Sequence, residues 1–205
     1  MAISYPLSLP THTGVAEIEL RAKNAVAYSQ SPFTFAGQAH AYSGQTWLAD
    51  VSLPPMRRVD AEKWVSWLVS LRGQFGTFLM GDTTCSTSRG LASTFPGNPI
   101  ITSQTGGTIS VTGASTSKSD WLLAGDYIQI GTGNDSTLHK VLVDASTDAS
   151  GNVALEIWPH VRGTRSGSVS VSNTQGRFRL STNEQSWSIN NASVYGISFS
   201  AMEAI

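Results

Sequence analysis

The sequence is poor in cysteine and in charge. Cys85 is the single cysteine among 205 residues, so no disulfide forms within the chain and the fold does not depend on an oxidising compartment. Lys, Arg, Asp and Glu make up 13% of the residues, against about a quarter in most soluble domains. The formal net charge of −1 lacks the positive excess of nucleic-acid-binding proteins. We therefore expect no nucleic-acid partner, and a surface suited to burial in an assembly.

Long apolar runs are also missing. No stretch approaches the roughly 20 residues that a membrane helix needs, so the sequence predicts no membrane insertion. The first residues, Met1 to Pro6, contain no basic segment followed by an apolar run and predict no signal peptide. We expect synthesis in a cytoplasm.

Motifs for metal, phosphate or nucleophilic chemistry are absent as well. The four histidines, at positions 12, 40, 139 and 160, share no metal-ligand spacing, and ordinary polar positions are the better interpretation. The sequence contains no G-x-S-x-G elbow and no phosphate-binding loop. It therefore predicts no catalytic, metal-binding or cofactor-binding residues, and a protein that is not an enzyme.

Three weaker candidates are weighed against simpler interpretations. Asp144, Asp148 and Asn152 loosely resemble an oxygen-rich calcium loop, but a solvated hairpin turn explains their spacing better. Cys85 has no adjacent base and is interpreted as a bystander thiol. Two carboxylates on neighbouring candidate strands, Asp126 and Glu156, leave a glycan hydrolase open as a minor alternative.

What the sequence does contain is a succession of strand and turn signals around one helix. Apolar and polar residues alternate over 15–21 and 25–29, and again over 39–42 and 45–53, which predicts four strands. Trp64, Trp67, Leu68 and Leu71 follow at helical spacing and predict a helix over 60–72 that covers a sheet, with Asp60 as its N-cap and Gly73 just after its end. Strand character then resumes over 74–80.

The second half reads as short strands at intervals of about ten residues, which favours a small barrel. They fall at 108–112, 125–131, 138–144 and 153–159, and strand character returns over 177–180 and 194–203. A chain that ends on a core strand pairs it with an early element. We therefore predict a mainly β protein with one principal α-helix: a split β-sandwich or barrel domain, 1–85 plus 176–205, with a small β-barrel module inserted at 86–175.

Aromatic and arginine side chains provide the candidate contact residues. Of the six tryptophans, Trp64 and Trp67 belong to the helical stripe and are expected in the core. Exposed tryptophans stack on sugar rings or bury at protein interfaces, and arginine suits carboxylates on a neighbouring subunit. The candidates for an interface or a glycan site are Trp121, Trp158, Trp187, Arg162 and Arg165.

The order of these elements resembles a known family. A predicted strand pair comes first, followed by the segment Leu53-Pro54-Pro55-Met56, the Trp64 helix and the segment Leu71 to Asp82. The segments Gly125 to Gly131 and Leu155 to Arg162 come later in the chain. This arrangement resembles the distal tail proteins of long-tailed bacteriophages and related prophages, which join the tail tube to the baseplate or tail tip.

The resemblance implies a split β domain that forms a ring, usually a hexamer, and an inserted OB-like or galectin-like module that faces outward. It implies a location in the phage virion after synthesis in the host cytoplasm. The implied partners are further copies of the chain, the tail tube protein, baseplate hub or tail-tip proteins and, for the inserted module, a host glycan. A carbohydrate-binding or adhesin-like module is the alternative interpretation.

Overall fold

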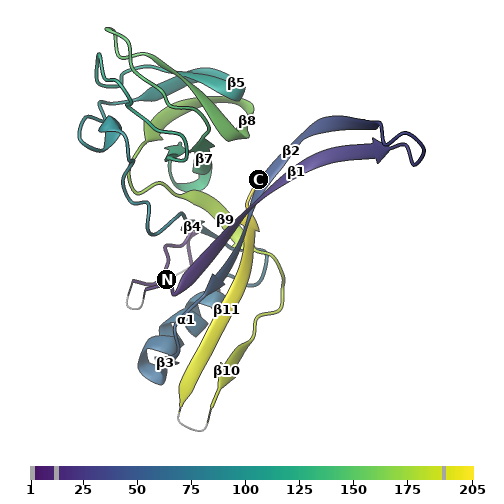
Figure 1. The fold of residues 1–205 in the computed structure, drawn as a ribbon. Coiled ribbons are helices and arrows are strands. Elements are labelled where there is room, and N and C mark those ends of the chain that lie inside the picture. The colour runs from purple at the N-terminus through teal and green to yellow at the C-terminus, as the bar shows by residue number, and fades with distance from the viewer. Residues whose placement is uncertain (1–2, 12–13, 191–192) are drawn as a thin grey trace.

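The fold, seen in a computed structural model that describes residues 3–11, 14–190 and 193–205, is mainly β with one α-helix (Figure 1). This confirms the predicted fold class. In chain order the elements are β1 (Glu17–Gln30), β2 (Gly37–Ser52), β3 (Met56–Arg57), α1 (Arg58–Ser70), β4 (Thr77–Met80), β5 (Ile100–Val111), β6 (Tyr127–Ile130), β7 (Thr137–Val141), β8 (Val153–Ser170), β9 (Gly176–Leu180), β10 (Trp187–Ile189) and β11 (Val194–Glu203), with short 3-10 turns at Leu91–Ser93 and Gly133–Asp135.

The strands form two sheets. The first has the order β1-β2-β11-β9-β4, with β3 and β10 also paired to β11, and so takes its strands from both ends of the chain. The terminal strand β11 pairs with β2 from Ser198↔Ser52 to Met202↔Leu48, as its place in the sequence predicts. The second sheet, β5-β8-β6-β7, is a curled half-barrel because β8 also pairs with β7. The domain boundaries drawn from the sequence stay a prediction.

Each sheet has its own apolar core. The helix α1 covers one face of the first sheet, and the four residues of its predicted apolar stripe are all buried. The Trp67 ring lies 5.0 Å from Phe78 and 5.6 Å from Phe199, and its indole N–H donates to the Ser8 carbonyl at 2.9 Å. The core of the second sheet lies between Ala92 and Val171. The helix is therefore held by aromatic packing against β4 and β11.

Both ends of the helix differ from the prediction. It begins at Arg58, and its N-cap is Arg57 with no side-chain cap, because Met56 and Arg57 pair with β11 and the chain turns straight from strand into helix. Asp60, predicted as the N-cap, instead lies in the first turn, where its charge still favours the helix dipole. At the other end Arg72 already has a positive φ of 53°, one residue before Gly73.

The strand predictions for 15–29 and 39–53 are wrong in one respect. Each pair of short strands is a single long strand, and β1 pairs with β2 over nearly its whole length. The alternation is broken where the register shifts between Asn24 and Val26, and such a bulge imitates a strand end in the sequence. Likewise β5 and β8 are longer than predicted, reaching Ile100 and Ser170. The outer halves of β1 and β2 leave the sheet as one ribbon (Figure 1).

Candidate functional site: a projecting arm and two surface clefts

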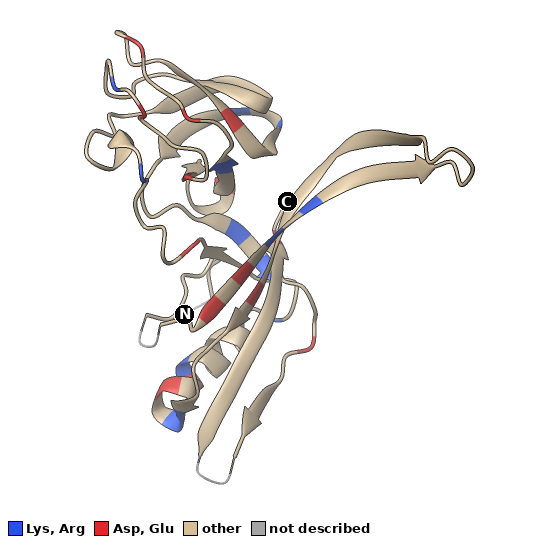
Figure 2. Cartoon of the chain, in the orientation of Figure 1, with Lys and Arg blue, Asp and Glu red and all other residues tan. Residues whose placement is uncertain are grey.

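The arm is the hairpin formed by residues 24–46, which projects from the body of the molecule (Figure 1). From residue 21 to residue 44 every side chain except the half-buried Ser31 is exposed. The arm contains no Lys, Arg, Asp or Glu, and Figure 2 shows this ribbon without charged positions. An isolated two-stranded hairpin is at best marginally stable in water, and exposed strand edges are normally protected by charge or proline. These properties suit a hairpin that another protein covers.

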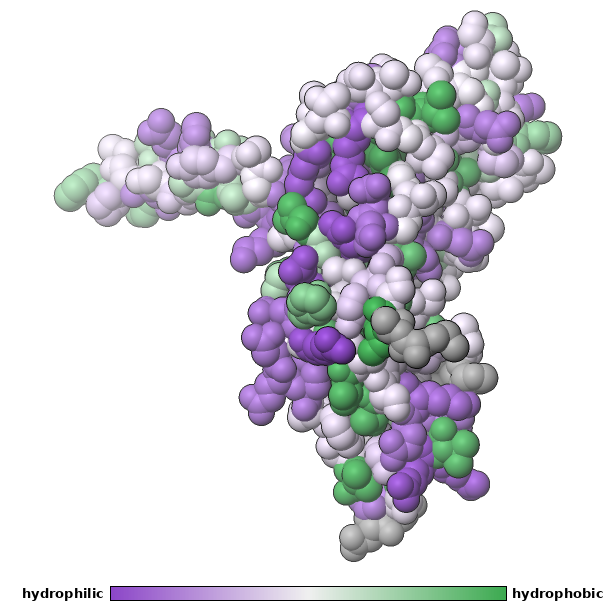
Figure 3. Space-filling view, turned by 180° about the vertical axis from the view of Figure 1, so that it is seen from behind, coloured by the Kyte–Doolittle hydropathy of each residue, from purple (hydrophilic) through white to green (hydrophobic). Residues whose placement is uncertain are grey.

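The free end of the arm presents two phenylalanines on an ordered turn. Phe33 is 91% and Phe35 74% exposed, and apolar surface marks this end in the space-filling view of Figure 3. Ser31 holds the turn: its N–H donates to the Ala36 carbonyl at 3.0 Å, and its hydroxyl accepts from the Phe33 N–H at 3.3 Å. Phe35 has a φ of 56°, a costly conformation for a bulky residue. The turn thus fixes two apolar side chains in solvent.

The flanks of the arm are apolar too. Val26 and Tyr28 on β1 face Ala41 and Ala39 on β2, and Val26 is 53% and Tyr28 64% exposed. Tyr28 lies across Gly37, where an added Cβ would meet the tyrosine hydroxyl at 2.4 Å. Glycine therefore lets the tyrosine ring lie flat along this face.

A cluster of contacts between the two sheets fixes the base of the arm, at the bulge. The Trp158 indole N–H donates to Asn24 Oδ1 at 2.7 Å, and the His160 N–H donates to Gln45 Oε1 at 2.7 Å. Trp158 also packs edge-on against Trp47, with ring centroids 4.5 Å apart. The inserted sheet therefore holds both strands of the hairpin where they bend away from the body.

An ion pair reinforces the same junction. Arg162 on β8 binds Glu203 on β11 with two parallel hydrogen bonds of 2.9 and 2.8 Å, and also donates to the Gln45 carbonyl. The Glu203 side chain is only 3% exposed, and the Trp47 N–H donates to it at 3.2 Å. A buried carboxylate needs such partners to offset its lost hydration. We call these contacts of Asn24, Gln45, Trp47, Trp158, His160, Arg162 and Glu203 the junction.

A cleft of about 720 Å³ opens beside the junction, between the base of the arm and the β5–β8 ribbon. The bulge residue Ala25 and the opposing Ser43 and Gly44 form one wall, so the register shift that bends the arm also lines the cleft. We call it the junction cleft; its lining is Lys23, Ala25, Ser43, Gly44, Gln45, Thr46, Thr105, Gly106, His160, Val161, Arg162, Gly163 and Ile205. Its charged lining residues are Lys23 and Arg162, and Glu203 neutralises the second.

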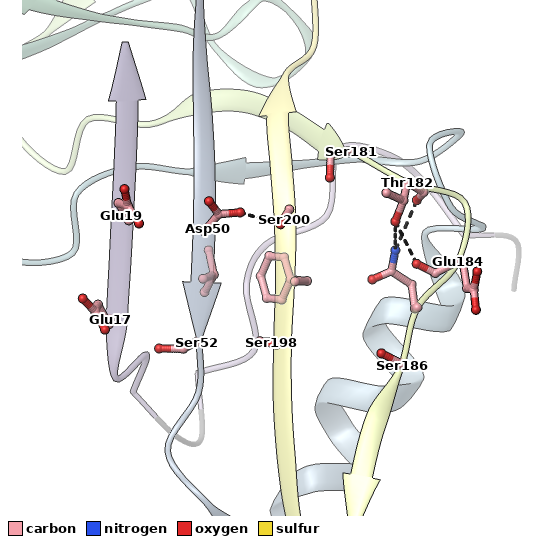
Figure 4. A pocket seen from close by; sticks show the side chains of 13 residues that line it. Glu17, Glu19, Asp50, Ser52, Ser181, Thr182, Glu184, Ser186, Ser198 and Ser200 are labelled. Carbon is pink, nitrogen blue, oxygen red and sulfur yellow. Dashed lines mark hydrogen bonds between the residues drawn. The ribbon is translucent and has the colours of Figure 1, made fainter. Parts of the chain in front are cut away.

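A second, polar groove of about 450 Å³ lies on the face of the first sheet opposite the helix (Figure 4). Glu17, Glu19 and Asp50 line it from β1 and β2, and serines of β11 face them. Asp50 is bound by Arg21 and by the Ser200 hydroxyl. Among the described residues no group of His, Cys, Asp and Glu is arranged to hold a metal ion. The groove is a polar surface lined by carboxylates and hydroxyl groups.

The predicted contact residues are used mainly inside the chain. Trp121 is fully buried, and its indole N–H donates to the Phe95 carbonyl at 2.9 Å, so it offers no exposed ring to a sugar or a partner protein. Trp158 and Arg162 belong to the junction, and Arg165 donates to the Asp135 carbonyl at 2.8 Å. Trp187 is 37% exposed. Burial removes Trp121 from the sugar-platform interpretation, whereas Trp158 is half-buried and Trp187 is exposed.

The histidines behave as structural residues where the structure describes them. His139 is buried, with Nδ1 2.6 Å from the Pro159 carbonyl and Nε2 2.9 Å from the Thr137 hydroxyl. Burial lowers the pKa of His139 from 6.5 to about 4, although the Pro159 bond and Glu203 oppose the shift. His40 and His160 are exposed, and His12 lies outside the described residues.

The carboxylates weighed for a hydrolase have separate structural tasks. Asp126 is buried and accepts from the backbone N–H groups of Arg89, Gly90 and Leu123 at 2.9–3.3 Å. Glu156 accepts from the Thr108 hydroxyl at 2.6 Å. Both carboxylates are thus bound by neighbours within the chain.

The remaining candidates also bind within the chain. Asp148 closes a turn by accepting from the N–H groups of Ser150 and Asn152, both at 2.8 Å, which lowers its pKa. The pKa of Cys85 is raised, first by burial and then by Asp82, which disfavours the reactive thiolate.

The arm tip is the feature that the sequence prediction missed. Phe33 and Phe35 were assigned no role, although the run without charge from residue 24 to residue 46 surrounds them. A segment of that length with strand character and no charge is itself a signal of a strand pair that a partner covers.

No protein-family model matches the chain, and no curated protein sequence matches it. No helix within the described ranges is both long and apolar enough to cross a membrane.

Proposed function

We propose that this chain is a structural protein of a bacteriophage tail, a distal tail protein whose copies form a ring between the tail tube and the baseplate or tail tip. Its partners would be further copies of itself, the tail tube protein and the baseplate hub or tail-tip proteins, and its place the virion. The observation that carries the proposal is the projecting arm: an exposed hairpin of 23 residues, 24–46, without charge.

The arm supports assembly for an energetic reason. Val26, Tyr28, Phe33 and Phe35 leave apolar surface in water on a ribbon that has no core of its own. Covering that surface is favourable at about 25 cal/mol per Å², and the ordered turn lowers the entropic cost of docking. A surface of this kind belongs to a subunit of an assembly, and the resemblance of the element order to distal tail proteins names which assembly.

The first experiment measures the mass of the purified full chain by sedimentation velocity over a hundredfold concentration range. We expect the fraction of a closed oligomer to increase with protein concentration, and negative-stain images of this oligomer should show rings. The second experiment locates the protein on phage particles with a specific antibody in electron micrographs, where label at the distal end of the tail is expected. A chain that stays monomeric at the highest concentration refutes the proposal.

A further inference from the structure

We infer that the junction cleft is the docking site for the arm tip of a second copy of this chain. The inference rests on the proposed function, since it names the surfaces that join the subunits of the ring. Phe33 and Phe35 of one copy would enter the cleft beside Ala25 and Ser43 of the next.

The tip cannot reach the cleft of its own chain. Ala25 lines the cleft, and about 17 Å of strand separates it from Gln30, at 3.3–3.4 Å per residue. The ladder from Val26↔Ala41 to Gln30↔Gly37 keeps that length extended, and the arm points away from the body (Figure 1). Folding back would break the ladder. The occupant is therefore another molecule.

The two surfaces match in charge. The tip and the arm behind it carry no formal charge. Two charged side chains line the cleft, Lys23 and Arg162, and Glu203 binds the second with two hydrogen bonds. A basic segment entering this cleft would lose hydration and meet Lys23 without an acidic partner, and an acidic segment would find Lys23 alone. A neutral apolar segment avoids that cost, and the arm is a neutral apolar segment of this chain.

The two surfaces also match in size. A buried phenylalanine covers about 150–250 Å², so the two rings supply roughly 300–500 Å². A stable interface of standard size buries about 800 Å² on each partner, and the exposed flanks at Val26 and Tyr28 continue the apolar surface behind the tip. The cleft, at about 720 Å³, has room for two aromatic side chains.

The contact has a consequence for symmetry. Tip and cleft are different surfaces of one chain, so the contact is head-to-tail, and such contacts close into rings or run on as open helices. The junction contacts at Asn24 and Gln45 hold the base of the arm, and thereby its direction. A fixed arm direction is what selects one ring size over a distribution.

The test uses three variants of the full chain. In the tip variant, Phe33→Ser is combined with Phe35→Asn, because asparagine tolerates the left-handed backbone of residue 35. In the cleft variant, Ser43→Trp fills the cleft from an exposed strand position. The control is Phe75→Ser, which removes a phenylalanine that is 71% exposed but lies outside the arm and the cleft. Circular dichroism and thermal unfolding confirm that each variant is folded.

Sedimentation velocity then gives the assembly of each variant. The tip variant and the cleft variant should each assemble at least tenfold more weakly than the wild type, and the control should match the wild type. Mixed in equal amounts, the tip and cleft variants should form a 1:1 dimer and nothing larger, because each pair has one intact tip and one intact cleft.

The possible results separate the two proposals. If the wild type forms rings and the Ser43→Trp chain forms them equally well, the cleft is not the docking site, although the ring proposal stands. If the tip variant is impaired but the mixture yields no dimer, the tip docks elsewhere and the inference is wrong. A monomeric wild type overturns both proposals.

Discussion

Lowering the pH should destabilise this protein through His139. Burial lowers the pKa of His139 to about 4, whereas its ordinary value is 6.5. Above pH 6.5 the ring is neutral in both the folded and the unfolded chain, and it contributes no pH dependence. Between pH 6.5 and pH 4 the unfolded chain binds a proton that the folded chain excludes, so the free energy of unfolding falls as the pH falls.

The magnitude follows from the two pKa values. One pKa unit corresponds to 1.36 kcal/mol, so the shift of about 2.5 units amounts to about 3 kcal/mol once the pH is below 4. At pH 5 about 2 kcal/mol of this is already lost. Since domains are stable by only about 5–15 kcal/mol, the loss is large enough to measure.

The assay is urea unfolding at pH 7.5, 6.0 and 5.0, followed by tryptophan fluorescence, on the wild type and His139→Gln. Glutamine keeps a donor toward the Pro159 carbonyl and an acceptor for the Thr137 hydroxyl but does not titrate. Between pH 7.5 and pH 5 the free energy of unfolding of the wild type should fall by about 2 kcal/mol more than that of the variant. The carboxylates titrate in both proteins, so their contribution cancels in this difference. His40→Gln, at an exposed position, should follow the wild type. Parallel curves for the wild type and His139→Gln would refute the reasoning.

Two further predictions concern stability at neutral pH. Arg162→Ala removes the partner of a carboxylate that is 3% exposed and should cost about 3 kcal/mol in urea unfolding, whereas Arg165→Ala, which loses a bond to an exposed carbonyl, should cost about 1 kcal/mol; equal losses would contradict the burial of Glu203. Trp64→Ala removes a ring that is 1% exposed and should lower the free energy of unfolding by about 3–5 kcal/mol. Trp187→Ala is the matched control and should cost much less, and a reversed order in thermal unfolding would contradict the assignment of the core.

The local residue pattern was sufficient to predict an element that buries one of its faces, such as the helix. The stripe of Trp64, Trp67, Leu68 and Leu71 is periodic because one side of a helix meets a sheet, and all four residues are buried. The helix ends were misplaced because they depend on a distant strand. Met56 and Arg57 pair with Val194 and Tyr195, and no nearby residue records that pairing.

The candidate site shows the same division. Trp121 stands in a polar segment, which makes it a candidate for exposure, but it is buried in the core of the second sheet. Arg162, a candidate for an interface, pairs with Glu203, 41 residues away along the chain. A pattern read along the chain records the polarity of neighbours in sequence, whereas burial depends on neighbours in space.

By itself, the sequence determined the mainly β class, the single covering helix and the low charge of the surface. These properties follow from the composition and from the spacing of apolar residues, both of which can be seen within short segments of the sequence. Only the tertiary structure decided that residues 24–46 stand out as an arm, that its bulge lines a cleft and that Trp158, Arg162 and Glu203 hold its base. The physical reason is that all three features depend on contacts between strands far apart in the chain.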